Sequence, residues 1–189
     1  MNKIDTILDY WFEGVDDKTK IDVKNMPFKK WFIKNEKMDE EIRRQFESDI
    51  LAAADGQYKG WEDTARGRLA LIILFDQFSR NMYRDTAQMY AYDPLALKLT
   101  LGALGQDKEQ ELLLIERTFL YMPLMHSEDL KRQQLSLKCF SRLVAESKVK
   151  NPDNMHYYEY TLKYAQEHHD TVAQSGRFPH RDSILSRVV

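Results

Sequence analysis

The sequence predicts an all-α fold of about seven helices, and three observations support this prediction. Glycine (7) and proline (5) are scarce among the 189 residues, which is typical of helical rather than loop-rich β architectures. Apolar residues recur at the three- and four-residue spacings that place them on one helix face. No segment shows the alternating pattern of a half-buried strand. The length fits a single domain over residues 1–189, and the short links favour antiparallel neighbours.

The first helix is predicted before Gly14, because apolar residues recur there at helical spacing. The polar segment that follows, residues 15–27, is expected to be an exposed loop whose end docks on the core through Trp31 and Phe32. The buried face of this first helix is predicted to contain Ile4, Ile7, Leu8, Trp11 and Phe12.

Two more helices are predicted in the first half of the chain. One spans about residues 36–55 and ends at Gly56, a natural C-terminal cap. The next begins near Thr64, and its stretch over residues 69–75 is apolar on every side. Such a helix is expected to lie at the centre of the fold, contacted from several directions.

Proline and glycine mark the limits of the next two predicted helices. Asp93 starts the first of them, with Pro94 in its first turn and Gly105 at its end. Asp107 is expected to cap the second, which Pro123 closes.

The last two predicted helices are separated by residues 151–152. Ser127 is expected to be the N-cap of the first, with Glu128 and Asp129 in its first turn, where the helix dipole favours anions. The second is long and covers about residues 153–173.

Composition and charge exclude several classes of protein. The net charge of −2 and the absence of a basic run argue against nucleic-acid binding. The longest apolar run, residues 69–75, is far shorter than the ~20 residues that cross a bilayer, so no membrane segment is expected. Cys139 is the only cysteine, which excludes an intrachain disulfide, and the N-terminus lacks the apolar core of a signal peptide. We therefore expect a cytoplasmic protein.

Charged and imidazole groups accompany aromatics at four places where a helix would ordinarily just end. In the segment of residues 75–84, Asp76 and Arg80 are four residues apart and can meet on one helix face. The four segments are residues 75–84, 92–93, 116–128 and 168–181.

The end of the chain is the densest of these segments. A helix stop needs only a glycine and a proline, here Gly176 and Pro179. The additional Arg177, His180 and Arg181 need either buried carboxylate partners or an anionic ligand. The candidate binding residues of the whole chain are Asp76, Gln77, Arg80, Asn81, Arg84, His126, Glu128, Arg177, His180 and Arg181.

Three of these motifs resemble the signatures of a bacterial family called domain of unknown function 924. They are residues 75–81 (FDQFSRN), 122–128 (MPLMHSE) and 176–181 (GRFPHR), and the resemblance covers nearly the whole chain. It implies a tetratricopeptide-like α-α superhelix and a family without an established biochemical role. Four residues depart from those usual in the family: Ser79, Ser175, Asp182 and Ser186.

The favoured functional hypothesis is a non-catalytic binding module. Its ligand would be a peptide, a protein partner or a small anionic molecule in a polar groove near the terminal motif. The cations would bind a carboxylate, a phosphate or an acidic peptide. The oligomeric state stays open, with a dimer among the alternatives. The cations in question are Arg80, Arg84, Arg177, His180 and Arg181.

The first alternative is a small-molecule enzyme that uses histidines and carboxylates of the same groove, with or without a divalent metal. No H-E-x-x-H or comparable ligand spacing is present, so neither a metal nor a cofactor is expected. The groups for this alternative are Asp76, Glu128, His126, His180 and one of His168 and His169.

The second alternative is a structural scaffold whose charged cluster is only a buried ion network. In that case breaking the network at Arg181 should cost ~3–5 kcal/mol, because a carboxylate is left uncompensated. An arginine that faces a ligand should cost little stability when replaced. The acids Asp76, Glu116 and Glu128 would then pair with Arg80, Arg177 and Arg181.

Overall fold

The computed structural model describes residues 2–22, 24 and 26–187, and every regular element within them is helical. α4 (Ala65–Ile72) continues through a π-helical segment, η2 (Ile73–Phe78), into α5 (Ser79–Met82). Counting this rod once gives eight helices in the described residues, against about seven predicted, and the all-α class is confirmed. The other helices are α1 (Lys3–Phe12), α2 (Met26–Phe32), α3 (Glu36–Ala54), α6 (Asp93–Leu104), α7 (Leu114–Met125), α8 (Leu130–Lys150) and α9 (Met155–Ser175).

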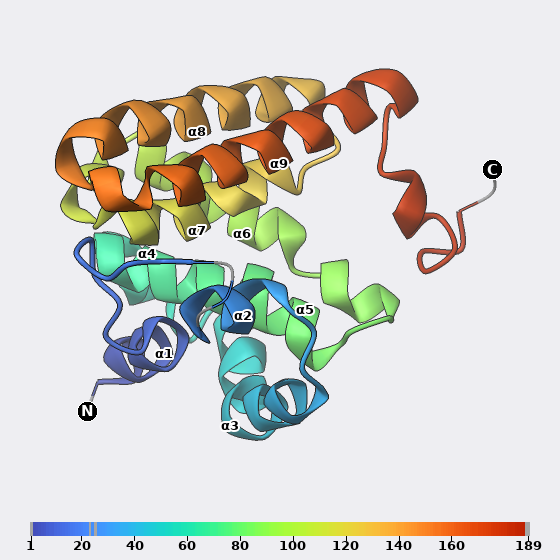
Figure 1. The fold of residues 1–189 in the computed structure, drawn as a ribbon. Coiled ribbons are helices and arrows are strands. Elements are labelled where there is room, and N and C mark those ends of the chain that lie inside the picture. Colours follow the sequence, from blue (N-terminus) through green and yellow to red (C-terminus); the bar gives the residue numbers. More distant parts are fainter. Residues whose placement is uncertain (1, 23, 25, 188–189) are drawn as a thin grey trace.

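The rod that begins with α4 lies at the centre of the molecule (Figure 1). It packs against α1, α3, α6 and α7, and its residues Leu69, Ile72 and Leu74 are completely buried. This confirms the central helix predicted from the apolar stretch. α8 and α9 lie side by side and cover α7 (Figure 1). Such helix pairs are the unit of tetratricopeptide-like stacks, and a superhelical arrangement of the whole chain stays a prediction.

The middle of the rod is π-helical where the sequence changes from apolar to polar. The chain does not end its helix there but continues to Met82. Three successive side chains donate to carbonyl oxygens four residues earlier, so the backbone of this segment is also bonded by its own side chains. These bonds run from Ser79 Oγ to Phe75 (2.6 Å), from Arg80 Nη1 to Asp76 (2.8 Å) and from Asn81 Nδ2 to Gln77 (3.0 Å).

The predicted loop after the first helix is shorter than expected. Its end is helical, because α2 begins at Met26 and contains both Trp31 and Phe32. Trp31 docks as predicted: it is buried, and its Nε1 donates to the carbonyl of Trp11 at 3.0 Å. Residues 23 and 25 of the predicted loop lie outside the described residues.

Two predicted helix limits in the second half of the chain are wrong. Pro123 lies inside α7, which continues to Met125, because the fixed φ of proline is compatible with a helix even though one backbone bond is lost. The N-cap of α8 is Asp129 rather than Ser127. The Asp129 carboxylate accepts from the amides of Lys131 (2.7 Å) and Arg132 (3.2 Å), which a hydroxyl two residues earlier does not reach.

Two helix starts also differ from the prediction. α7 begins at Leu114 rather than after Asp107, and a 3₁₀ turn, η4 (Lys108–Glu111), precedes it. In α6, Asp93 is the first helical residue and Tyr92 occupies the N-cap position. None of the described helices is both long enough and apolar enough to span a membrane.

The chain turns sharply after α9. Gly176 has a φ of +68°, a left-handed conformation that glycine adopts without strain, and its amide donates to the carbonyl of Val172 at 2.8 Å. The terminal segment then leaves α9 and runs toward the α5 side of the molecule through a 3₁₀ turn, η6 (Pro179–Arg181) (Figure 1). This turn brings Arg181 beside Asp93 of α6.

Candidate functional site

Asp76, in the π-helical segment, is the buried centre of the polar cluster. Its side chain is completely buried, and it lies 2.7 Å from His126 Nδ1 and 3.2 Å from Arg80 Nη1. Gln77 Nε2 donates to its second oxygen at 2.6 Å. Burial alone would raise the pKa of Asp76, but the charges of Arg80 and then His126, with hydrogen bonds, outweigh it and hold the pKa at about 2. Asp76 is therefore ionised at neutral pH.

Asp93, at the start of α6, is the second acid of the cluster and bridges two arginines. Arg80 contacts both of its oxygens, at 2.8 and 2.9 Å. Arg181 Nη1 donates to it at 3.4 Å, and Arg181 Nη2 donates to the carbonyl of His126 at 3.0 Å. Two carboxylates thus face two guanidiniums. We call Asp76, Arg80, Asp93 and Arg181 the inner ion cluster.

Aromatic rings enclose the Arg181 end of this cluster. The guanidinium carbon of Arg181 lies 4.4 Å from the ring centroid of Tyr90 and 4.6 Å from that of Phe178. Both distances are within the range of cation–π attraction. Arg181 Nε is buried and has no hydrogen-bond partner in the described part of the chain. Burial lowers the pKa of Arg181, although Asp93 opposes this change.

A second set of ion pairs holds the terminal segment from outside. Glu128 accepts from both Nη atoms of Arg187 at 2.8 Å and from the amide of Phe178 at 2.9 Å. Arg177 Nε donates to both oxygens of Asp182, at 3.1 and 3.0 Å. We call Glu128, Arg177, Asp182 and Arg187 the outer clasp. It fixes the terminal segment to the turn before α8.

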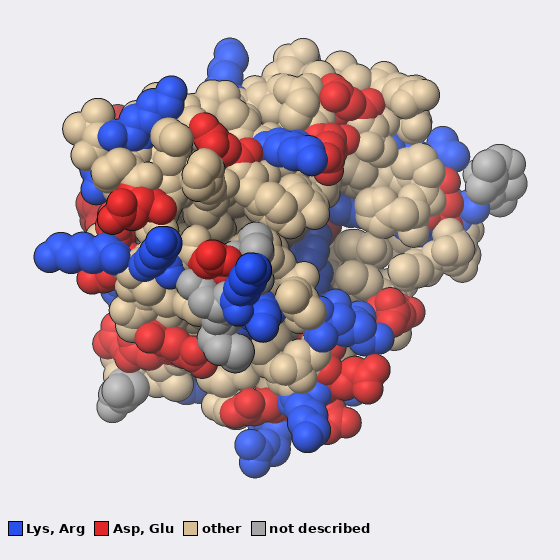
Figure 2. All heavy atoms as spheres, viewed as in Figure 1, with Lys and Arg blue, Asp and Glu red and all other residues tan. Residues whose placement is uncertain are grey.

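Two cavities that share residues form a groove along α9. One of about 190 Å³ lies between α2, α7 and α9, and the other, of about 200 Å³, lies between α9 and the terminal segment. They share Tyr164 and His168, and we call both together the α9 groove. Figure 2 shows a hollow between α9 and the α5 side of the molecule, with basic side-chain atoms on its floor, whereas no Lys or Arg lines the two cavities of the groove itself. The groove is lined by Phe32, Met122, Met125, His126, Tyr160, Thr161, Tyr164, Glu167, His168, Thr171, Phe178 and His180.

Two histidines face the first of these cavities. The ring centroids of His126 and His168 are 6.1 Å apart, and His168 Nδ1 lies 2.8 Å from the carbonyl oxygen of Tyr164. Burial, and then the charges of His126 and Arg181, lower the pKa of His168 to about 4, although the bond to Tyr164 opposes them. His168 is therefore neutral at neutral pH. Burial and the charge of Arg181 also lower the pKa of His180.

The inner ion cluster contains some, but not all, of the predicted pairs. Asp76 and Arg80 meet as their spacing predicts. Glu116 does not join them, since it pairs with Arg66 at 3.0 Å on another side of the fold. Arg84 also lies apart, because it binds both oxygens of Asp39, at 2.7 and 2.9 Å.

The remaining predicted residues divide between the cluster and the groove. Gln77 and His126 contact Asp76 directly, and Asn81 bonds the backbone of Gln77. Glu128 and Arg177 belong to the outer clasp, and His180 lines the groove.

The candidate list missed several residues that the structure brings to this site. From the sequence, Asp93 is predicted to start a helix and belongs to a polar segment, but neither it nor Arg187 is among the candidate binding residues. On α9, Tyr160, Tyr164 and His168 line the groove because they recur at four-residue spacing. That spacing was visible in the sequence, but it also fits ordinary core packing. No group of three or more His, Cys, Asp or Glu in the described residues is arranged to hold a metal ion.

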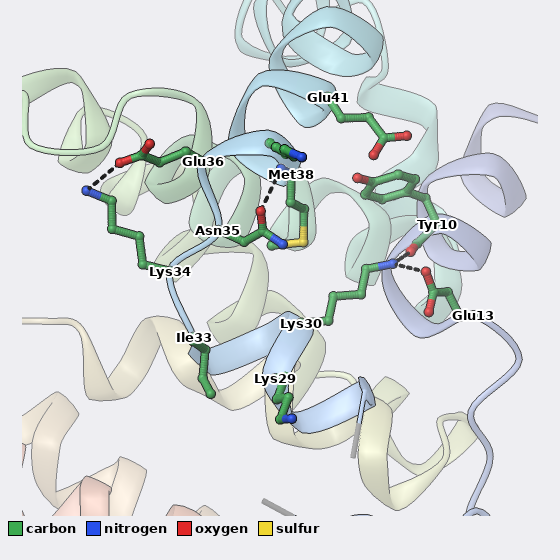
Figure 3. A pocket seen from close by; sticks show the side chains of 11 residues that line it. Tyr10, Glu13, Lys29, Lys30, Ile33, Lys34, Asn35, Glu36, Met38 and Glu41 are labelled. Carbon is green, nitrogen blue, oxygen red and sulfur yellow. Dashed lines mark hydrogen bonds and ion pairs between the residues drawn. The ribbon is translucent and has the colours of Figure 1, made fainter. Parts of the chain in front are cut away.

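A larger cavity, of about 840 Å³, lies elsewhere, between α1, α2 and the start of α3 (Figure 3). Its most buried cation is Lys30, whose amine donates to Glu13 at 2.6 Å and to the carbonyl of Tyr10. Lys34 and Glu36 pair across its rim at 3.6 Å. Four lysines and three glutamates line this cavity, and two of the lysines, Lys30 and Lys34, form ion pairs with its glutamates.

Comparison with known proteins supports the motifs described above. A model for a family of bacterial proteins of unknown function, DUF924, matches residues 7–189. Among solved structures, the protein of unknown function ATU0120 from Agrobacterium tumefaciens is 33% identical, with 99% of this chain and 92% of that chain covered and a TM-score of 0.79. No curated protein matches the chain. The family match includes every residue of the inner ion cluster and of the α9 groove and assigns no activity to them.

Proposed function

The chain belongs to the DUF924 family of bacterial proteins of unknown function, and we propose that it is a non-catalytic binding module. The geometry of the chain itself supports this proposal. Its ligand lies in the α9 groove and is a small molecule or the side chain of a bound peptide. The observation that carries this proposal is a cavity of about 190 Å³ into which His126 and His168 project between aromatic walls. Concave, mostly apolar cavities with a few fixed polar groups are the usual form of ligand sites.

The polar groups of the groove are held in place before any ligand binds. Asp76 fixes the His126 ring, and Asp76 is itself held by Arg80 and Gln77. His168 is held by the carbonyl one helical turn earlier. A site whose side chains are already ordered loses less entropy on binding. This arrangement gives the inner ion cluster a supporting role behind the groove rather than a direct role in contacting the ligand.

The dimensions of the groove suit a short ligand. Its α9 wall runs over twelve residues, from Tyr160 to Thr171, a distance of about 16 Å at the rise of an α-helix. An extended peptide of about five residues has the same length. The exposed fraction of Tyr164 is 41%, so the middle of the groove is open to solvent.

The proposal is tested by NMR titration of the purified protein with a fragment panel and with five-residue peptides that carry the same groups. We expect amide shifts confined to α7, α9 and the terminal segment, and weaker binding in Tyr164→Ala. His169→Gln, on the same helix but outside the groove, is the matched control and should bind as the wild type does. Shifts elsewhere, or equal affinity in Tyr164→Ala, would contradict the proposal. Binding of the peptide but not the free fragment would identify a peptide site.

A second candidate function, general base catalysis, is favoured by the 2.7 Å bond between Asp76 and His126. A carboxylate behind an imidazole orients the ring and stabilises its protonated form during proton transfer. Hydrolysis of p-nitrophenyl acetate provides a simple assay. A catalyst should exceed the rate of free imidazole at equal concentration and lose that excess in His126→Gln. A rate equal to that of imidazole removes this candidate.

We also propose a cytoplasmic location. It is supported by the single cysteine, Cys139, which is buried and for which burial raises the pKa to about 11, so that its thiol stays protonated. Fractionation of the native host tests this location, and recovery outside the cytoplasm would contradict it.

A further inference from the structure

The bonding partners of His126 and His168 determine where each ring carries its proton. His168 Nδ1 lies 2.8 Å from the carbonyl oxygen of Tyr164, and a carbonyl oxygen only accepts. His126 Nδ1 lies 2.7 Å from Asp76, which is ionised and therefore also only accepts. Both Nδ1 atoms must therefore be N–H donors.

The opposite edge of the His168 ring follows from this assignment. His168 is neutral at neutral pH, and a neutral imidazole has one N–H and one lone pair, so its Nε2 carries the lone pair. No hydrogen-bond partner for Nε2 of either histidine is found among the described residues. Both rings line the same cavity, with their centroids 6.1 Å apart. The cavity thus contains a hydrogen-bond acceptor at a fixed position, His168 Nε2.

The guanidiniums nearest to this cavity, which could attract an anion, already form ion pairs with carboxylates of the protein. The guanidiniums of Arg80 and Arg181 share Asp93, and Arg80 also faces Asp76. The inner ion cluster therefore has as many carboxylates as guanidiniums. No Lys or Arg is among the residues that line this cavity, and most of the others are apolar or aromatic, such as Met125 and Phe32. The hydroxyl of Thr161 donates to the carbonyl of Tyr158.

We infer that the polar end of the ligand in the α9 groove is a neutral hydrogen-bond donor, a hydroxyl or N–H group on an apolar or aromatic body, and not an anion. This inference rests on the proposed function and defines its ligand class. It differs from the sequence-based expectation of an anionic ligand, because that expectation assumed unpaired arginines. A site built to accept a hydrogen bond discriminates strongly against a ligand that lacks the donor.

The test is a pair of probes with the same body, 4-methylphenol and 4-methylbenzoate, titrated at pH 8 and followed by NMR. We expect 4-methylphenol to bind in the groove at least about tenfold more tightly, a ratio of the size that one hydrogen bond produces. His168→Phe keeps a ring of similar size but removes the acceptor, and should abolish most of this preference. His169→Phe, at the neighbouring residue, should keep it.

The outcomes separate the inference from the proposed function. Tighter binding of 4-methylbenzoate in the groove would overturn the inference and leave a ligand site there. Binding of neither probe, together with no response to the fragment panel, would overturn both. A measurement without ligand is also decisive: ¹⁵N spectra of labelled histidine at pH 8 should show His168 as a neutral Nδ1–H tautomer. A proton on Nε2 of His168 would overturn the inference.

Discussion

The inner ion cluster and the outer clasp each use an arginine of the same terminal segment, but in different surroundings. Arg187 makes the better pair, with two bonds of 2.8 Å to Glu128, yet 34% of its side chain is exposed. Arg181 makes the poorer pair, at 3.4 Å from Asp93, and only 8% of its side chain is exposed. The comparison shows that bond length alone does not rank ion pairs, because water can replace a lost partner only at the surface.

The largest expected difference in the free energy of unfolding is the one between variants in which Arg181 or Arg187 is replaced. Arg181→Gln should lower the free energy of unfolding by about 3–5 kcal/mol, because Asp93 loses a partner in the interior. Arg187→Gln is the matched variant, with the same substitution six residues away. Chemical denaturation of both proteins measures the difference.

The result for Arg181 also decides between its two sequence-based interpretations. Replacing an arginine that faces a ligand would lower the free energy of unfolding only slightly, whereas replacing a structural one lowers it by several kcal/mol. Its burial and its bond to the His126 carbonyl favour the structural role. Equal losses in Arg181→Gln and Arg187→Gln would show that burial does not separate the cluster from the clasp.

Local features of the fold could be predicted from the sequence, and long-range partners could not. The helix positions and the Asp76–Arg80 pair follow from spacings of three and four residues. Arg181 and Asp93, however, are 88 residues apart, and nothing in either segment says which helix end meets which. The sequence offers Glu116 as well as Asp93 as an acidic partner for the arginines of the terminal segment, but in the structure Glu116 pairs with Arg66.

The α9 groove could not be predicted from the sequence for a different reason. His168 and Tyr164 have the spacing of a buried helix face, and the same pattern describes a packed core or an open wall. Which of the two occurs depends on whether another element covers that face. Here the terminal segment turns away at Gly176, so part of the α9 face remains uncovered.

An effect of intermediate size on the free energy of unfolding is expected from the titration of His168, which lies between the inner ion cluster and solvent. Its pKa is lowered to about 4 in the folded protein, below the value of about 6.5 for an unfolded chain. As the pH falls from about 6.5 to about 4, the unfolded chain therefore takes up a proton that the folded protein does not. The free energy of unfolding should decrease by about 2–3 kcal/mol across this window.

His168→Gln removes this proton uptake, so its stability should fall less than that of the wild type between pH 6.5 and 4. Denaturation curves at half-unit pH steps measure the difference between the two proteins. His180, which faces the same side, is present in both, and its contribution cancels. His169→Gln is the control and should follow the wild type. Parallel curves for wild type and His168→Gln would show that His168 is protonated as easily in the folded protein as in the unfolded chain.

The smallest effect is expected at the outer clasp. Arg187→Gln should lower the free energy of unfolding by only about 0.2–1 kcal/mol, because both partners are reached by water. Raising the salt concentration to 1 M should remove most of this loss, since the Debye length falls to about 3 Å. The loss in Arg181→Gln should change much less, because buried pairs are poorly screened. If the Arg187 loss persisted in 1 M salt, Glu128 would be acting through its bond to the Phe178 amide and through packing, and the clasp would resemble the inner ion cluster more closely than its exposure suggests.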